Sequence, residues 1–263
     1  MATENPHITD DYIFELEQKP EALRNALLNG DWDSFEGQVF TEFVNRPDLG
    51  KKFTHVIEDF PIPLNWPRYF SFDFGYSDPF ACQWWAIDPK GTAYLYREWY
   101  GCVPNKADVG IKLTPEQIMN GILEREEEES ENNLFISRVA DSSIFDKDRG
   151  DSIADQMAPG YYGRHKGVVF TKCDKARLPG KMEVHERLKF DKDGVPGMYI
   201  FSSCKDWIRT VPNLPYSEKK AEDIDTEAED HDYDATRYFL MEHPLTATKK
   251  PPREYKPWSP FEN

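Results

Sequence analysis

The chain has 263 residues, 39% of them hydrophobic and 14% aromatic, which is enough for one substantial buried core. The longest apolar runs, such as residues 80–87, fall far short of the ~20 residues that span a bilayer, and the N-terminus lacks a signal-peptide pattern. We therefore expect a soluble, intracellular protein with no membrane partner. The net charge of -16 argues against a simple nucleic-acid-binding protein, unless the acidic residues are concentrated in a metal site and in solvated runs.

The cysteines suggest neither a zinc site nor a disulfide framework. They lie far apart and include no Cys-x-x-Cys pair, so we interpret them as reduced, mostly buried thiols: Cys82, Cys102, Cys173 and Cys204.

The first half of the chain predicts a connector followed by three strands. Residues 10–35 have apolar side chains at helical spacing and predict a connector helix. After three prolines, a strand is expected at 68–74, with a turn behind it. Two more strand-like segments, 81–87 and 93–100, are separated by Asp-Pro-Lys-Gly, which favours an antiparallel meander.

The second half alternates helices and strands. A helix is expected to begin at Thr114 as N-cap, with Pro115 and Gln117 completing the cap signal, and to cross over to a buried parallel strand at 134–140. Beyond that strand we expect helices at 151–157, 181–188, 205–210 and 229–241, strands at 167–171 and 198–201, a hairpin around 191–194 and a proline-rich tail from 243. This order predicts an α/β fold of ribonuclease H type, a mixed β-sheet flanked by helices on both faces.

Three aspartates stand where apolar side chains should pack. Asp73 lies inside an otherwise apolar strand, Asp141 directly follows another at its carboxyl end, and Asp234 occupies the core-facing side of the last helix. Such carboxylates repel one another unless they are protonated or bridged by cations, and Mg²⁺ or Mn²⁺ prefers oxygen ligands. Two ions ~3.5–4 Å apart can stabilise the attacking and leaving oxygens of a phosphodiester. On this basis Asp141→Asn should relieve repulsion and raise metal-free stability while abolishing cleavage.

Three segments resemble the nuclease motifs of tailed-phage terminase large subunits, in the family's order. They are Phe-Asp-Phe-Gly-Tyr-Ser-Asp-Pro-Phe at 72–80, Val-Ala-Asp-Ser-Ser at 139–143 and the stretch 225–238, which ends in Asp-Ala-Thr-Arg-Tyr. Residues 28–33 resemble the segment that joins the family's ATPase domain to its nuclease. The resemblance therefore covers about residues 8–242.

The resemblance implies a ribonuclease H-like endonuclease that cuts double-stranded concatemeric DNA at the start and end of genome packaging, by metal-dependent hydrolysis that uses two ions. It implies Asp73, Asp141 and Asp234 as catalytic metal ligands, with Asp78 as a candidate accessory ligand. Asp232 is the main rival of Asp234, yet only Asp234 directly precedes the Ala-x-Arg-Tyr part of the motif.

The same resemblance implies partners and a setting. Besides double-stranded DNA, these are an ATPase domain in cis, the portal protein and the small terminase subunit, in the host-cell cytoplasm and not in the mature virion. Because the chain has no G-x-x-x-x-G-K-[ST] phosphate loop, we expect an excised domain or a natural split product without ATP-driven translocation. The expected parts are a linker helix and connector from the missing ATPase domain at 1–60, the nuclease domain at 61–245 and an extended tail at 246–263.

Six basic residues after the second motif are candidates to hold DNA phosphates, although solvated surface charge explains each equally well: Lys147, Arg149, Lys172, Lys175, Arg177 and Lys181. Two other functions stay open. One is a non-catalytic docking module for portal or packaging proteins. The other is an actin-like ATPase-fold phosphotransferase, because the segment 73–75 resembles the phosphate-binding turn of that class, although no second glycine-rich adenosine-binding region follows.

Overall fold

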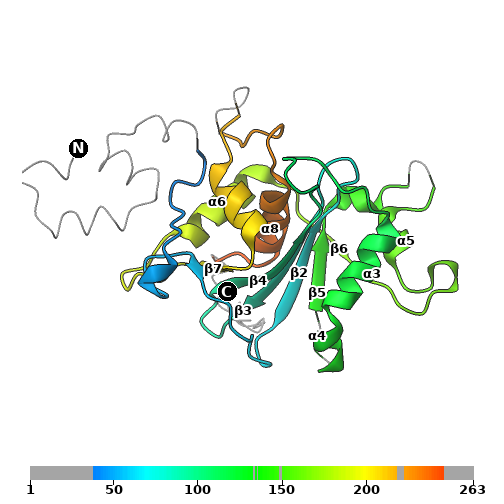
Figure 1. The fold of residues 1–263 in the computed structure, drawn as a ribbon, viewed down its shortest axis with the longest axis horizontal. Coiled ribbons are helices and arrows are strands. Elements are labelled where there is room, and N and C mark those ends of the chain that lie inside the picture. The colour runs from blue at the N-terminus through cyan, green and yellow to red at the C-terminus, as the bar shows by residue number, and fades with distance from the viewer. Residues whose placement is uncertain (1–37, 133, 135, 148–149, 218–221, 246–263) are drawn as a thin grey trace, which may run out of the picture.

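The computed structural model describes residues 38–245 apart from 133, 135, 148–149 and 218–221 (Figure 1). The connector helix predicted at 10–35 and the tail at 246–263 lie outside the described residues. Within the described part, seven strands form one mixed sheet in the order β1-β7-β4-β3-β2-β5-β6. The strands are β1 (Val56–Ile57), β2 (Arg68–Asp73), β3 (Ala81–Ile87), β4 (Ala93–Tyr100), β5 (Ile136–Ala140), β6 (Thr171–Lys172) and β7 (Met198–Phe201).

The predicted meander and crossover are confirmed. β2, β3 and β4 pair antiparallel in sequence order, with a bulge between Trp84 and Trp85. β5 then pairs parallel to β2, as expected after a crossover helix, and β6 pairs parallel to β5 at the edge of the sheet. On the other side, β7 lies parallel to β4, and β1 lies parallel to β7.

Six α-helices are found among the described residues, and none of them is long and apolar enough to cross a bilayer. Their bounds are α3 (Pro115–Arg125), α4 (Glu127–Glu131), α5 (Ile153–Met157), α6 (Arg177–Leu188), α7 (Lys205–Thr210) and α8 (His231–Glu242). The capping box predicted for α3 is present: the Thr114 hydroxyl accepts from the Gln117 amide at 3.3 Å, and the Gln117 side chain accepts from the Thr114 amide at 2.9 Å. Short 3₁₀ turns are η2 (Pro47–Leu49), η3 (Ser142–Phe145), η4 (Tyr161–Gly163) and η5 (Val211–Asn213).

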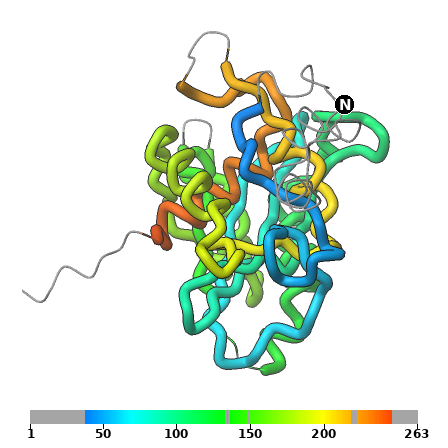
Figure 2. Tube along the Cα trace, turned by 90° about the vertical axis from the view of Figure 1, so that its left-hand side faces the viewer, coloured from blue at the N-terminus to red at the C-terminus, as the bar shows by residue number. Residues whose placement is uncertain are grey.

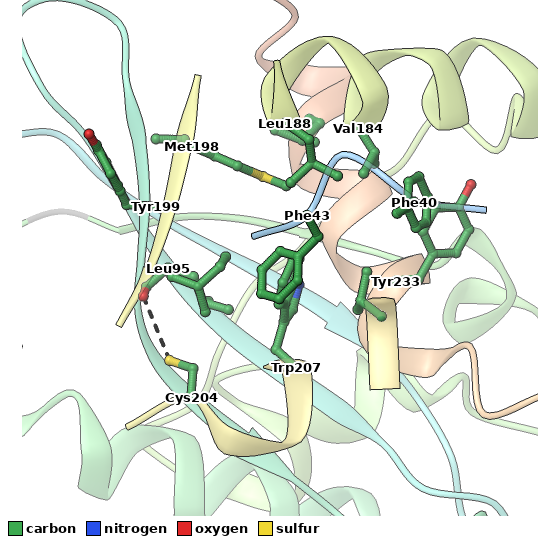
Figure 3. Packing of buried hydrophobic residues seen from close by; sticks show 14 of the residues in the cluster. Phe40, Phe43, Leu95, Val184, Leu188, Met198, Tyr199, Cys204, Trp207 and Tyr233 are labelled. Atoms are coloured by element: carbon green, nitrogen blue, oxygen red, sulfur yellow. Dashed lines mark hydrogen bonds between the residues drawn. The ribbon is translucent and has the colours of Figure 1, made fainter. Parts of the chain in front are cut away.

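Helices cover both faces of the sheet, as the predicted fold class requires (Figure 1). One core cluster joins β4 and β7 to α6, α7 and α8, and its side chains interlock around Trp207, Phe43 and Leu188 (Figure 3). The Cys204 thiol in this cluster donates to the Leu95 carbonyl at 3.6 Å. A second cluster lies on the opposite face, where Phe70 and Phe72 of β2 pack with α3 and α5.

One predicted strand is much shorter in the structure. Of the expected 167–171, only Thr171 pairs with β5, together with Lys172. Gly167 lies so close to the backbone at 157–159 that a Cβ there would meet the Pro159 nitrogen at 2.4 Å. The Val168 amide also donates to the Met157 carbonyl at 2.9 Å. Gly167 and Val168 therefore pack against α5 and the chain that follows it, and not against the sheet.

Residues 38–57, predicted as part of a connector, lie inside the domain. Val39, Phe40 and Phe43 belong to the same core cluster as α6 and β7, and β1 extends the sheet. Figures 1 and 2 show this segment in blue alongside the part of the chain that carries α6 and β7. The predicted boundary at residue 60 therefore does not coincide with a break in the packing.

Candidate active site

Asp73 is the last residue of β2, and the pleat of that strand decides where its side chain points. Phe70 and Phe72 face the core cluster that packs with α3. Because successive side chains of a strand point to opposite faces, Asp73 faces the other side of the sheet, which α8 covers. The residue is only 8% exposed. An apolar strand thus delivers one carboxylate to the interface between the sheet and α8.

Asp141 follows β5 directly and caps the N-terminus of η3, and its surroundings hold it as an anion. Its carboxylate accepts from the Ser143 amide at 3.1 Å and from the Ser143 hydroxyl at 2.8 Å, while Lys175 Nζ lies 2.5 Å from Oδ1. Burial acts to raise the pKa of Asp141, but the hydrogen bonds from Lys175 and Ser143 outweigh it and hold the pKa below its usual range. The carboxyl end of β5 therefore presents a second, ionised carboxylate.

Asp234 lies in the first turn of α8, three and four residues before two of its partners. Arg237 donates to Oδ1 from Nε at 3.1 Å and from Nη2 at 2.9 Å, and the Tyr238 hydroxyl lies 3.2 Å from Oδ2. Arg177 Nη1 is 4.0 Å from the same Oδ1. Since Arg237 is only 2% exposed, this carboxylate compensates a buried guanidinium.

The three predicted aspartates come together at one end of the sheet. The Tyr238 hydroxyl lies 3.5 Å from Asp73 Oδ1 as well as 3.2 Å from Asp234, so it joins two of them. Burial, followed by the negative charges of Asp234 and Asp141, raises the pKa of Asp73 to about 6, although His231 opposes this shift. Burial and the charges of all three aspartates likewise raise the pKa of Tyr238. Negative charge is therefore concentrated at this point.

His231, which the sequence reasoning did not single out, is part of this cluster. Its Nδ1 lies 3.1 Å from Asp73 Oδ2 and its Nε2 lies 3.2 Å from Asp108 Oδ1. Burial acts to lower the pKa of His231, but the hydrogen bond and charge of Asp73, with the charges of Asp230 and Asp108, raise it to about 9. The available signal was helical spacing, because His231 precedes Asp234 by three residues in the third motif.

Cationic side chains hold the three carboxylates in this arrangement. His231 holds Asp73, Lys175 holds Asp141, and Arg237 holds Asp234. No group of three or more His, Cys, Asp or Glu side chains within the described part of the chain is arranged to hold a metal ion. The predicted role of these aspartates as metal ligands stays a prediction, and ligation would require Asp141 to exchange its contact with Lys175.

Two further aspartates considered as metal ligands, Asp232 and Asp78, lie in different surroundings. Asp232 points away from this cluster: Oδ1 accepts from Gln83 Nε2 at 3.1 Å, Oδ2 accepts from the Thr210 hydroxyl at 3.2 Å, and the residue is 1% exposed. The side chain of Asp78 is exposed in the turn after β2. Its accessory role stays a prediction.

The basic residues predicted to hold DNA fall into two groups. Two are engaged inside the domain: Lys181 is 6% exposed and donates to the Glu222 carbonyl, and Arg177 Nε bonds both oxygens of Asp223 at 3.1 Å. Lys175, as described, is paired with a carboxylate.

The second group is at the surface. Lys147 Nζ lies 2.8 Å from Asp155, with both side chains exposed, and exposed Lys172 lies 5.2 Å above the Phe145 ring. Arg149 lies outside the described residues. Contact of any of these residues with DNA stays a prediction.

Comparison with solved structures finds proteins with a similar fold. No family model and no curated protein matches the chain. The large terminase of a thermophilic bacteriophage is similar over 78% of this chain and 45% of its own, with 21% identity and a TM-score of 0.57. The same terminase in complex with ADP is similar over 90% of this chain and 53% of its own, with 19% identity and a TM-score of 0.56. The nuclease domain of the P22 large terminase is similar over 79% of this chain and 92% of its own, with 16% identity and a TM-score of 0.54.

The chain spans about half the length of the thermophilic phage's large terminase. At these identities the likeness concerns the fold, and it confirms the ribonuclease H-like mixed sheet flanked by helices that the sequence predicted. The chain therefore has the fold of the nuclease domain of a phage large terminase.

Proposed function

We propose that this chain is a metal-dependent endonuclease domain that hydrolyses phosphodiester bonds in double-stranded DNA. The observation that carries the proposal is the position of Asp73 near two further carboxylates: its own burial, and then the charges of Asp234 and Asp141, raise its pKa to about 6. Three carboxylates that meet at one end of the sheet attract cations, and the His231, Lys175 and Arg237 side chains already contact them.

The residues fit a hard divalent ion better than a softer one. The donors are carboxylate oxygens from β2, η3 and α8, which suit Mg²⁺ or Mn²⁺, and the four cysteines are not gathered into a site. Asp73, Asp141 and Asp234 would hold the metal, and we propose two ions, with Asp78 as an accessory ligand. Such ions would activate a water and stabilise the departing oxygen of a phosphodiester.

The chain's own residues prepare this site. Lys175 and Ser143 keep Asp141 ionised, and a metal ion would take the place that Lys175 holds at this carboxylate. His231 holds one oxygen of Asp73, and Tyr238 fixes the distance between Asp73 and Asp234. These contacts fix the carboxylates before a substrate arrives, which lowers the reorganisation that catalysis requires.

The wider role is proposed from the structural neighbours, which are large terminases. We propose that the domain cuts concatemeric viral DNA when packaging begins and ends, in the host-cell cytoplasm. Its partners would be an ATPase domain in cis, the portal protein and the small terminase subunit.

The test is cleavage of supercoiled plasmid with Mg²⁺, with Mn²⁺ and with EDTA. We expect nicked and linear products only with metal, and loss of both products in Asp73→Asn and Asp234→Asn. The matched control is Asp193→Asn, an exposed aspartate in the turn at 191–194, which should cleave like the wild type. A second readout is thermal stability, because an ion that binds only the folded state raises the melting temperature.

Either of two results would contradict the proposal. Cleavage that persists in EDTA or in both variants would remove the role of the carboxylates. An absence of cleavage, together with no metal-induced rise in melting temperature, would favour the docking module.

A further inference from the structure

The segment 156–173 differs in charge from the rest of the chain. The protein contains 48 acidic residues and a net charge of -16, yet these 18 positions hold no Asp or Glu. They do hold Arg164, His165, Lys166 and Lys172. The segment therefore carries no negative charge of its own, although the adjoining Glu116 pairs with Arg164. Phosphate is attracted to its exposed lysines, Lys166 and Lys172.

The middle of this segment, residues 159–169, presents an aromatic side chain to solvent, and we name it the Tyr162 loop. Tyr162 is 88% exposed and has a φ of 47°, a conformation that residues other than glycine adopt uncommonly. Its ring lies 4.4 Å from that of Tyr161 in a T-shaped contact. Val169 is 65% exposed in the same loop, and both His165 and Lys166 are exposed. Folding alone gives no reason to keep so much apolar surface in water.

The base of the Tyr162 loop is held in place. Arg164 donates to the Gln156 and Tyr161 carbonyls and pairs with Glu116 at 3.4 Å, and its carbonyl accepts from the Gly160 amide at 2.7 Å. The exposed side chains are therefore presented from a fixed frame, which lowers the entropy cost of binding a partner.

The loop lies on the face of the sheet that α3 and α5 cover, where Arg164 contacts Glu116 and Met119 of α3. The chain after it forms the edge strand β6, in which Thr171 and Lys172 pair with Val139 and Ala140 of β5. Asp141 is the next residue after β5. The loop runs outward beside α5, on the right-hand side of Figure 1.

We propose that the Tyr162 loop is a DNA-binding element at the β6 edge of the sheet, in which Lys166 neutralises a backbone phosphate and Tyr162 packs against the sugars or bases of the duplex. This inference rests on the proposed nuclease function and extends it to a surface outside the carboxylate cluster. An exposed lysine beside a projecting aromatic ring matches a nucleic acid, which offers both negative charge and flat rings.

The experiment measures binding of a fluorescent 30-base-pair duplex by the full chain in EDTA over a series of salt concentrations. Tyr162→Ala should weaken binding roughly tenfold, whereas Tyr162→Phe should retain it because the ring remains. Lys166→Gln should lower the slope of log K against log salt by about 0.9, the value for one lost phosphate contact. The matched control is Lys90→Gln, an exposed lysine in the turn between β3 and β4, at the end of the sheet opposite Asp73; its slope should not change.

Wild-type affinity and slope in both Tyr162→Ala and Lys166→Gln would overturn the inference. In that case the loop is a surface for a protein partner. Plasmid cleavage by the wild type, measured in parallel with Mn²⁺, separates this failure from a failure of the proposed function. If the wild type cleaves while the loop variants bind normally, only the inference about the loop is lost; a wild type that neither binds nor cleaves removes both.

Discussion

At the scale of single residues, the clustered aspartates are not equivalent. Burial and like charges raise the pKa of Asp73, so its ionised form destabilises the folded state at neutral pH. Asp141 is the opposite case, because Lys175 and Ser143 lower its pKa and its charge stabilises the fold. This corrects the expectation, drawn from sequence, that neutralising Asp141 would relieve repulsion. Lys175, far along the chain, already provides that relief.

We therefore predict opposite effects of two isosteric substitutions on metal-free stability. In EDTA at pH 7.5, Asp73→Asn should raise the melting temperature by about 3 °C, a change of roughly 1 kcal/mol in a domain of this size. Asp141→Asn should lower it by a similar amount, because the contact with Lys175 loses its charge. Circular dichroism measures both. Equal shifts in the same direction would show that the two carboxylates share one electrostatic environment.

At the scale of elements, contacts of buried side chains position helix α8, in addition to the contacts that its active-site residues make. Asp232 and Thr236 bond to Gln83 of β3, and Trp207 of α7 donates to the Thr236 hydroxyl at 2.8 Å. Burial raises the pKa of Asp232 to about 7. These contacts fix the rotation of α8 and hence the direction in which Asp234 points.

Because Asp232 lies on the buried side of α8 and Asp234 on the active-site side, we predict different effects of substituting them. Asp232→Asn keeps an acceptor for Gln83 and removes a costly buried charge, so stability should change by less than about 1 kcal/mol and plasmid cleavage should persist. Asp232→Ala leaves buried donors unpaired and should cost about 2–3 kcal/mol in urea unfolding. Asp234→Asn should lose cleavage and also lower stability, because it removes the charge that compensates the buried Arg237; circular dichroism shows whether the variant is still folded at the assay temperature. If Asp232→Asn were inactive and Asp234→Asn active, the assignment would be reversed.

Some elements could be predicted from the sequence, and others could not. Strands β2 to β5 and helix α3 follow from alternation, turn residues and the capping signal at Thr114, which are local. Strand β1 has two residues and exists only because β7 lies beside it, so no local pattern indicates it. The three aspartates stood out as charges in apolar surroundings, whereas the contact of Lys175 with Asp141 depends on β6 returning beside β5.

At the scale of the whole molecule, the sheet depends on the segment before residue 60. Its buried apolar side chains are Val39, Phe40, Phe43, Val44, Val56 and Ile57, and all of these except Val44 belong to the cluster that also holds α6, α7 and α8. His55 ties the same segment to α6, since its Nε2 lies 2.8 Å from the Leu188 carbonyl. The helix that carries Asp234 therefore shares its core with residues that the sequence assigned to a connector.

We predict that a chain beginning at residue 61 does not fold cooperatively. Losing a single large buried side chain costs about 2–5 kcal/mol, so losing six costs about 12–30 kcal/mol, which matches or exceeds the roughly 5–15 kcal/mol that stabilises a typical domain. Thermal unfolding of residues 61–263, compared with the full chain by circular dichroism, should show no sharp transition. If the fragment melted as sharply as the full chain, residues 38–57 would not be needed for a stable core. Because α8 packs on that core, loss of the segment should also remove metal-dependent cleavage, although no proposed ligand lies within it.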